Sequence, residues 1–364
     1  MFKNSDSKIG TKETITLITI LLFTNTFNNT PSFIFKDAKN AGWVVPIFSA
    51  VIILIPILCT LNLLKKFKDK GLIEIIYILI GKYVGFILIL LLIVLNIFFL
   101  IGNIRDNCST ISTLFFPKTS TEILVFTLIG SSCYLGSLGL KASARTAFLF
   151  LFYFIINLLL ILIFSKHLII PAFLFPLAGG GIKSIFKASL LNVPIFQVII
   201  LLSICFPMFK NHKSFKKSSL FSLLISCILI AVIFIILQMT FDYPATSIIA
   251  LPFFTFVRLI NITRFLSNLE ALLFLPSVII LVLYYSVYLY LVTAMFTYLL
   301  KLKKIEPFIL PVTALITLLC LIPENSIKIS LLIHTYLLPI LSTFIIILPI
   351  TLSIIAQWKG DYNK

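Results

Sequence analysis

Six polar side chains fall within seven residues of an otherwise apolar stretch near the start of the chain: Thr24, Asn25, Thr26, Asn28, Asn29 and Thr30. Amides and hydroxyls at this density suit hydrogen bonding to a small polar solute. An amide left unpaired in apolar surroundings costs several kcal/mol, so these groups must face water, a ligand or other helices. Thr24, Asn25 and Asn28 are the candidate ligand-binding residues, with interhelical hydrogen bonding as the alternative.

A second apolar stretch is interrupted in a similar way, by Asn192, Pro194 and Gln197. Asn25 and Gln197 are eleventh and tenth from the outer ends of their charge-free runs, which places them at similar depth. Interrupted helices at corresponding places in two halves of a chain indicate a transporter binding site. We therefore expect Asn192 and Gln197 to converge with the three candidates of the first stretch.

A possible charge site lies further along the chain, where Glu270 is embedded in apolar sequence. A carboxylate in a membrane segment is a functional candidate by default. Its partner could be Arg264 or Arg258, in a structural ion pair, while contact with a ligand amine and proton coupling are the alternatives. Asn96 and Asn103 could line the same cavity as the amides above, or bond only to neighbouring helices.

Catalytic and metal-binding patterns are not visible. The chain has 12 Asp and Glu, 3 His and 6 Cys. They form no Ser-His-Asp arrangement, carboxylate pair, His cluster or Cys-x-x-Cys motif. We expect no enzyme, no metal site and no cofactor.

The elements that position these residues follow from composition. Of 364 residues, 60% are hydrophobic and 11% charged, and the mean hydropathy is +1.16. Soluble domains carry about 25% charged residues. The sequence predicts a single all-α, polytopic membrane domain, because lipid forces each span to satisfy its own backbone hydrogen bonds and a span needs about 20 apolar residues. Ten spans are expected, at residues 14–35, 40–64, 83–104, 123–140, 146–165, 188–209, 218–241, 268–298, 307–323 and 331–357.

Charge in the connections predicts orientation. With the N-terminus cytoplasmic, 19 of the 29 Lys and Arg residues fall inside and 10 outside, so both termini are expected in the cytoplasm. This topology, together with anionic membrane lipid, accounts for the net charge of +17 without nucleic acid. Ten helices also permit a 5+5 inverted repeat, since five is odd and the two halves then have opposite orientation. The longer connections, 105–122, 166–187 and 242–265, are expected outside.

Several ordered motifs carry a family resemblance. They are the polar first span with Asp37 to Val44 after it, the turn Phe116-Pro117-Lys118-Thr119-Ser120, the turn from Gly139 to Arg145, and the segment from Phe256 through Arg264 to Phe274. In order and spacing they resemble the spore germination proteins that form the B subunit of nutrient germinant receptors. Those proteins belong to the amino acid–polyamine–organocation transporter superfamily. The chain reads Ile195-Phe196-Gln197 where that family often has Phe-Gly-Glu.

The resemblance implies a germinant-sensing subunit of the spore inner membrane. It would respond to a small polar nutrient such as an amino acid and act with an A subunit and a lipoprotein C subunit. The fold alone would equally suggest an amino-acid permease of the same superfamily.

Overall fold

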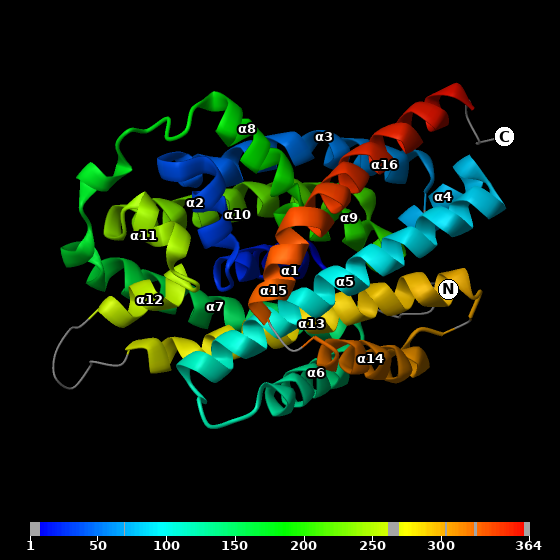
Figure 1. Ribbon diagram of the computed structural model, residues 1–364. Coiled ribbons are helices and arrows are strands. Elements are labelled where there is room, and N and C mark those ends of the chain that lie inside the picture. Colours follow the sequence, from blue (N-terminus) through cyan, green and yellow to red (C-terminus); the bar gives the residue numbers. More distant parts are fainter. Residues whose placement is uncertain (1–7, 69, 261–268, 303, 324–325, 360–364) are drawn as a thin grey trace.

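The computed structural model describes residues 8–68, 70–260, 269–302, 304–323 and 326–359, without the side chains of 269–273 and 327 (Figure 1). These residues are almost entirely helical, and their β-structure is one isolated bridge between Ile9 and Phe209. The predicted all-α, polytopic membrane fold is confirmed. Long helices such as α3, α5, α10 and α13 run from one end of the molecule to the other (Figure 1).

The first half of the chain contains nine helical elements among the described residues. They are α1 (Thr11–Phe23), η1 (Thr24–Thr26), α2 (Thr30–Ala38), η2 (Lys39–Val44), α3 (Val45–Lys66), α4 (Leu72–Ile80), α5 (Lys82–Leu114), α6 (Thr121–Ser137) and α7 (Leu140–Phe164). The second half has η3 (Lys166–Leu168), η4 (Pro171–Leu174), α8 (Ile182–Leu191), η5 (Val193–Phe196), α9 (Val198–Leu202), η6 (Ser203–Met208), α10 (His212–Thr240), α11 (Tyr243–Ile248), α12 (Pro252–Leu259), α13 (Leu269–Leu299), α14 (Glu306–Leu321), α15 (Ser326–Leu332), the π-helical η7 (Ile333–Leu337) and α16 (Leu338–Trp358).

Six described helical segments are long and apolar enough to cross a membrane, and a seventh counts if the bent pair at residues 182–208 is one span. The shorter apolar helices α6 and α14 also coincide with predicted spans. With 17 residues, α6 is about 26 Å long, somewhat short of the hydrocarbon thickness of about 30 Å. The count of ten spans and the 5+5 repeat stay predictions.

Both predicted interruptions are confirmed. The first helix stops at Phe23 and resumes at Thr30, with Pro31 in its first turn. The second stops at Leu191 and resumes as η5 with Pro194 in its first turn, bent by 45°. Proline is tolerated there because the first turn leaves its N–H groups unpaired in any case. A glycine in the second break is therefore not needed to interrupt the helix.

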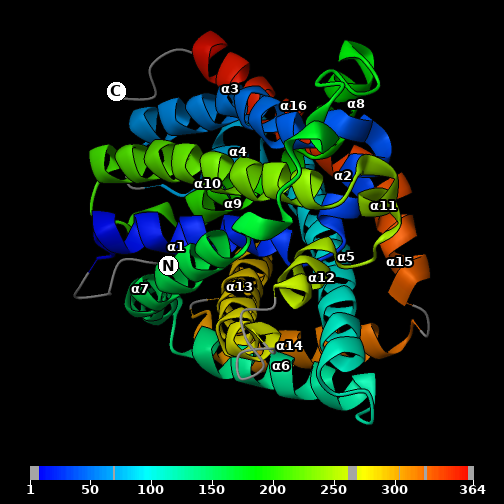
Figure 2. The same ribbon diagram turned by 90° about the vertical axis from the view of Figure 1, so that its left-hand side faces the viewer.

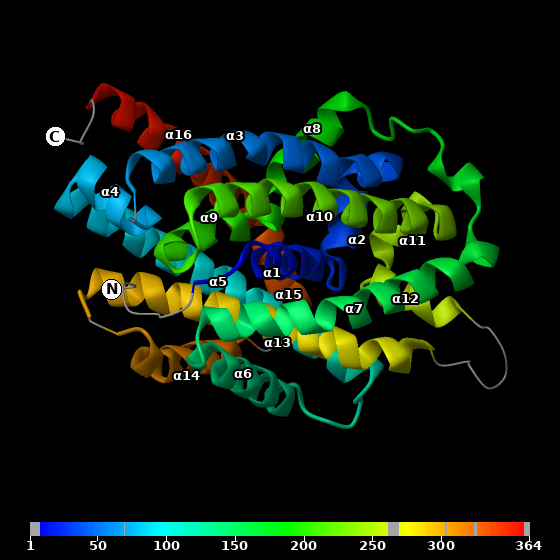
Figure 3. The same ribbon diagram turned by 180° about the vertical axis from the view of Figure 1, so that it is seen from behind.

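Helices α1 and α13 form the centre of the bundle. Helix α1 lies between α10 and α7 (Figures 2 and 3), and in the apolar window of α13, 83% of the residues are buried. Such helices have no polar face, as expected for helices surrounded by others. Large apolar side chains are exposed on the outer helices instead, including Ile55, Ile87 and Phe152.

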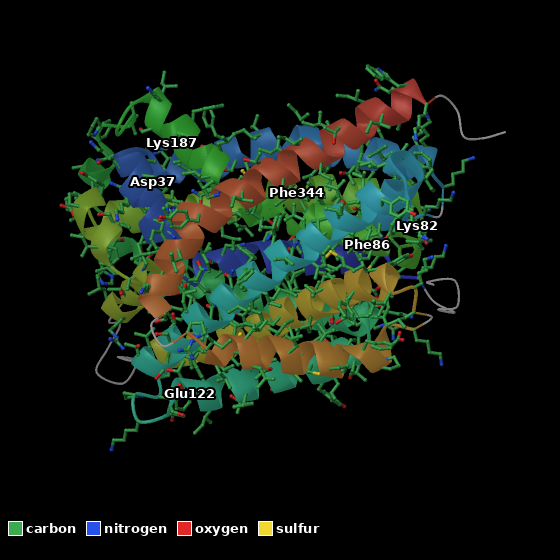
Figure 4. All side chains as sticks on the ribbon, turned by 45° about the vertical axis from the view of Figure 1, so that its right-hand side comes forward. Asp37, Lys82, Phe86, Glu122, Lys187 and Phe344 are labelled. Carbon is green, nitrogen blue, oxygen red and sulfur yellow. The ribbon has the colours of Figure 1, made fainter. Side chains whose placement is uncertain are left out.

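Charged side chains gather at the two ends of the bundle. Asp37, Glu122 and Lys187 lie toward one end and Lys82 at the other, with Phe344 between them (Figure 4). This division matches a membrane protein, because charges avoid the hydrocarbon core while apolar side chains contact it.

The structure corrects the predicted connection at residues 105–122. Helix α5 continues through Arg105 and Asp106 to Leu114, so the connection is shortened to residues 115–120. Cys108 is fully buried on this helix. The helix tolerates the charges because both residues are in hydrogen bonds with other parts of the chain.

Candidate ligand-binding cavity

A polar cavity lies where the two broken helices meet. Its volume is about 60 Å³, well above the roughly 10–15 Å³ that a single buried water needs. Its walls come from both breaks, from α5, and from the last span around η7. The lining residues are Asn25, Asn28, Asn29, Thr30, Phe33, Phe99, Gly102, Asn103, Asp106, Asn192, Pro194, Ile195, Ser330, Ile333, His334 and Leu338.

Asn25 joins the two breaks directly. Its Nδ2 donates to the carbonyl of Leu22, at 3.1 Å, and to the carbonyl of Ile195, at 3.4 Å. Leu22 lies in the last turn of α1. Asn25 thus bonds to a backbone carbonyl at each of the two breaks, and it holds the two interrupted helices against each other.

Asn28 connects the first break to α5. Its Nδ2 donates to Asn103 Oδ1 at 3.2 Å, and its Oδ1 accepts from the backbone N–H of Thr30 at 3.0 Å. The carbonyl of Asn103 in turn accepts from Asn107 and from the hydroxyl of Tyr285 on α13, both at 2.8 Å. Of the two alternatives for Asn103, the structure shows that it lines the cavity and also bonds to neighbouring helices.

Asp106 is the carboxylate of the cavity. Its Oδ1 accepts from Asn29 Nδ2 at 2.6 Å and from Ser330 Oγ at 3.0 Å. Its Oδ2 accepts one long bond, of 3.4 Å, from the backbone N–H of Asn29. These bonds tie the first break, α5 and α15 together around a half-buried negative charge.

The last span packs tightly against α5 at Gly102. A Cβ on Gly102 would overlap with Cδ1 of Ile333, in the first position of η7. The next residue, His334, stacks on Phe33 with ring centroids 4.4 Å apart, and its Nε2 lies 3.3 Å from Asp37 Oδ2. Single π-helical turns within longer helices are frequent at functional sites. Here the π-turn directs two side chains toward the cavity.

Not every predicted residue lines this cavity. Asn25, Asn28 and Asn192 do. Thr24 is buried and bonds to the carbonyl of Ile20 in its own helix. Gln197 donates to the Tyr288 hydroxyl at 3.3 Å and lines a separate, smaller cavity. It lies two residues after Ile195, which is about 200° further around a helix, so its side chain points away from the meeting point.

Of the three residues of the predicted charge site, the structure describes the side chain of Arg258 alone. Arg258 is exposed at the end of α12 and does not line the cavity. Arg264 and the side chain of Glu270 lie outside the described residues. The pairing expected among the three residues stays a prediction.

Sequence reasoning missed Asp106, Ser330 and His334. Asp106 was assigned to a connection because the predicted span ended at the first charge. A signal was present, since Phe99, Gly102, Asn103 and Asp106 follow the spacing of one helix face. Among the described residues no group of three or more His, Cys, Asp or Glu is arranged to hold a metal ion.

The fold and the cavity define a polytopic, transporter-like membrane protein, whose polar cavity lies where two broken helices meet. Residues 8–329 match the family described as spore germination proteins. The chain belongs to this family, which is not a class of enzymes.

Two relatives from Bacillus subtilis (strain 168) agree with the family. Spore germination protein B2 is 26% identical over 220 residues, covering 59% of this chain and 59% of its own length. YfkT, named as a candidate spore germination protein, is 26% identical over 246 residues, covering 67% and 66% respectively. The matched part is thus less than two thirds of either relative's length.

Proposed function

We propose that this chain is the transporter-like subunit of a spore nutrient germinant receptor, and that a small polar nutrient such as an amino acid binds in the cavity. The observation that carries the proposal is the contact between the two breaks at Asn25 and Ile195. A solute bound beside this contact would interact with both interrupted helices at once. A ligand that binds one arrangement of these helices more tightly would shift their equilibrium, which is all a sensor needs.

The proposed site of action is the spore inner membrane, with both termini in the cytoplasm. The chain would act there with a germinant receptor A subunit and a lipoprotein C subunit. The family membership and the relative named spore germination protein B2 support this assignment.

The test is deletion of the gene, followed by exposure of the spores to single nutrients. Loss of the response to one nutrient, restored by the wild-type gene, is the expected result. Co-purification from spore membranes should recover the A and C subunits. Unchanged responses to every nutrient would contradict the proposal.

An amino-acid permease is the second candidate, because paired broken helices are also the binding elements of transporters. The two functions differ in whether solute crosses the membrane. Proteoliposomes that contain this chain alone should not accumulate labelled glycine or L-alanine if it is a receptor subunit. Accumulation would favour the permease.

A further inference from the structure

In the cavity, the amide nitrogens of the asparagines are hydrogen-bonded more completely than their side-chain oxygens. Each side-chain amide nitrogen on its wall already donates to a protein acceptor: Asn25, Asn28, Asn29, Asn103 and Asn192. For Asn25, Asn103 and Asn192 that acceptor is a backbone carbonyl, which accepts only from the nitrogen. The orientation of these three amides is therefore fixed by their partners.

Some side-chain oxygens of the same asparagines accept no hydrogen bond. Among the described residues, the side-chain oxygen of Asn29 is buried without a hydrogen-bond partner, and no hydrogen bond is donated to the side-chain oxygens of Asn25 and Asn192. Buried polar groups in native proteins are nearly always paired. A ligand that carries several hydrogen-bond donors therefore suits these oxygens.

The negative charge of Asp106 also favours a ligand that brings hydrogen-bond donors. Within the described part of the chain, the donors to Asp106 are Asn29 and Ser330, which are both neutral. His334, on the same wall, faces Asp37 instead, at 3.3 Å. Carboxylates away from water are normally paired with a cation. Asp106 lacks such a partner, and its Oδ2 is the less occupied oxygen.

We propose that the cavity binds the protonated amine of its ligand, with Asp106 as the counter-ion. An ammonium group carries three donors and no acceptor, which matches the free oxygens of the wall. Phe33, Phe99 and Leu338 offer an apolar surface for a short aliphatic body. The cavity volume of about 60 Å³ favours a small ligand. This inference rests on the proposed function and names the chemical class of the nutrient.

The test uses the purified full-length protein in lipid nanodiscs, titrated with glycine, L-alanine and ethylamine. Propionate and L-lactate are the probes that lack the amine. We expect the amines to bind and the two amine-free acids not to bind at the same concentrations. This comparison uses wild-type protein alone, so it does not depend on how a variant folds. Equal binding of propionate, binding of none of the probes, or saturation of the site by Na⁺ alone would overturn the proposal.

The same titrations with the Asp106→Asn variant provide a second test. The substitution keeps the side-chain shape and one oxygen acceptor for Asn29 and Ser330, and it removes the charge. Loss of a charge-assisted hydrogen bond should raise the Kd of the amine probes about 10- to 150-fold. The control is Asp242→Asn, in which the carboxylate that caps α11 is replaced by an equally good cap, and its Kd should be unchanged. An unchanged Kd in Asp106→Asn would overturn the proposal.

Different results would contradict the receptor function and the amine-binding role of Asp106. Gene deletion that leaves nutrient responses intact contradicts the receptor function, whatever binds to the purified protein. Deletion that abolishes a response, combined with equal binding of amine-free probes, keeps the receptor function and removes the role of Asp106.

Discussion

Ile333 occupies the space that a side chain on Gly102 would need, so that α5 and the π-helical turn of the last span meet without an intervening atom. Both residues line the candidate cavity. Ile333 cannot move toward α5, so it can move only into the cavity or away from α5 together with its helix. A movement of the last span would therefore change the volume of the cavity.

Gly102→Ala should therefore reduce the response to ligand. The added methyl group displaces Ile333, and overpacking of this kind costs about 1–3 kcal/mol. We expect a lower apparent Tm in detergent and a higher nutrient concentration for half-maximal germination. Gly130→Ala on α6 is the matched control, since a Cβ there meets nothing within 4 Å. Adding Ile333→Val, which removes the overlapping Cδ1 atom, should recover part of the Tm lost in Gly102→Ala, and failure to do so would contradict this packing.

Asn25→Ala should shift the dose–response midpoint. The substitution removes the amide that bonds to the carbonyls of Leu22 and Ile195. Loss of a buried partner costs roughly 1–3 kcal/mol, or about a 5- to 150-fold rise in the required ligand concentration. Germination curves normalised to membrane protein level provide the measurement. Thr24→Val is the control, because Thr24 bonds within its own helix. A shift in the control alone would contradict the assignment.

Gly71→Ala should destabilise the protein strongly. A Cβ on Gly71 would overlap with the backbone carbonyl oxygen of Ile204, in η6. A backbone carbonyl cannot rotate away as a side chain can, so α4 must separate from η6. We expect a loss of about 1–3 kcal/mol, at the upper end of overpacking costs, seen as a fall in apparent Tm in detergent. A Tm equal to that of Gly130→Ala would show that the two elements do not pack this closely.

The connection at residues 209–211 should lie on the same side of the membrane as the N-terminal segment. The backbone N–H of Ile9 donates to the carbonyl of Met208 at 3.0 Å, and the N–H of Lys210 donates to the carbonyl of Ile9 at 3.3 Å. A reporter fused at Lys213 should therefore give a cytoplasmic signal, in agreement with the charge distribution. An external signal there would overturn the proposed orientation.

The contact between His334 and Asp37 should be weak. The atoms lie 3.3 Å apart, and the side chains are 15% and 30% exposed. Partly exposed ion pairs contribute about 0.2–1 kcal/mol. A double-mutant cycle with His334→Ala and Asp37→Ala, read from thermal unfolding, should give a coupling energy in this range. A coupling energy above about 2 kcal/mol would instead indicate that this ion pair binds α2 strongly to the last span.

The sequence by itself determined the fold class and the two helix breaks. The charge-free runs locate apolar helices because lipid excludes charges from its core, and this holds whatever packs against each helix. The breaks at Pro31 and Pro194 were also predictable, since proline and clustered amides act within a few residues of themselves. Asn25, Asn28 and Asn192 could be named for this reason.

Only the tertiary structure decided which side chains share the cavity. Gln197 has the right depth but faces Tyr288, because it lies two residues after Ile195 and so about 200° further around the helix. Asp106 lies beyond the apolar run, yet it faces the cavity because Asn29 and Ser330 satisfy it from other helices. Sequence patterns report the depth and period of a residue along its own helix. How each helix is rotated against its neighbours depends on contacts between distant segments, such as Ile333 against Gly102.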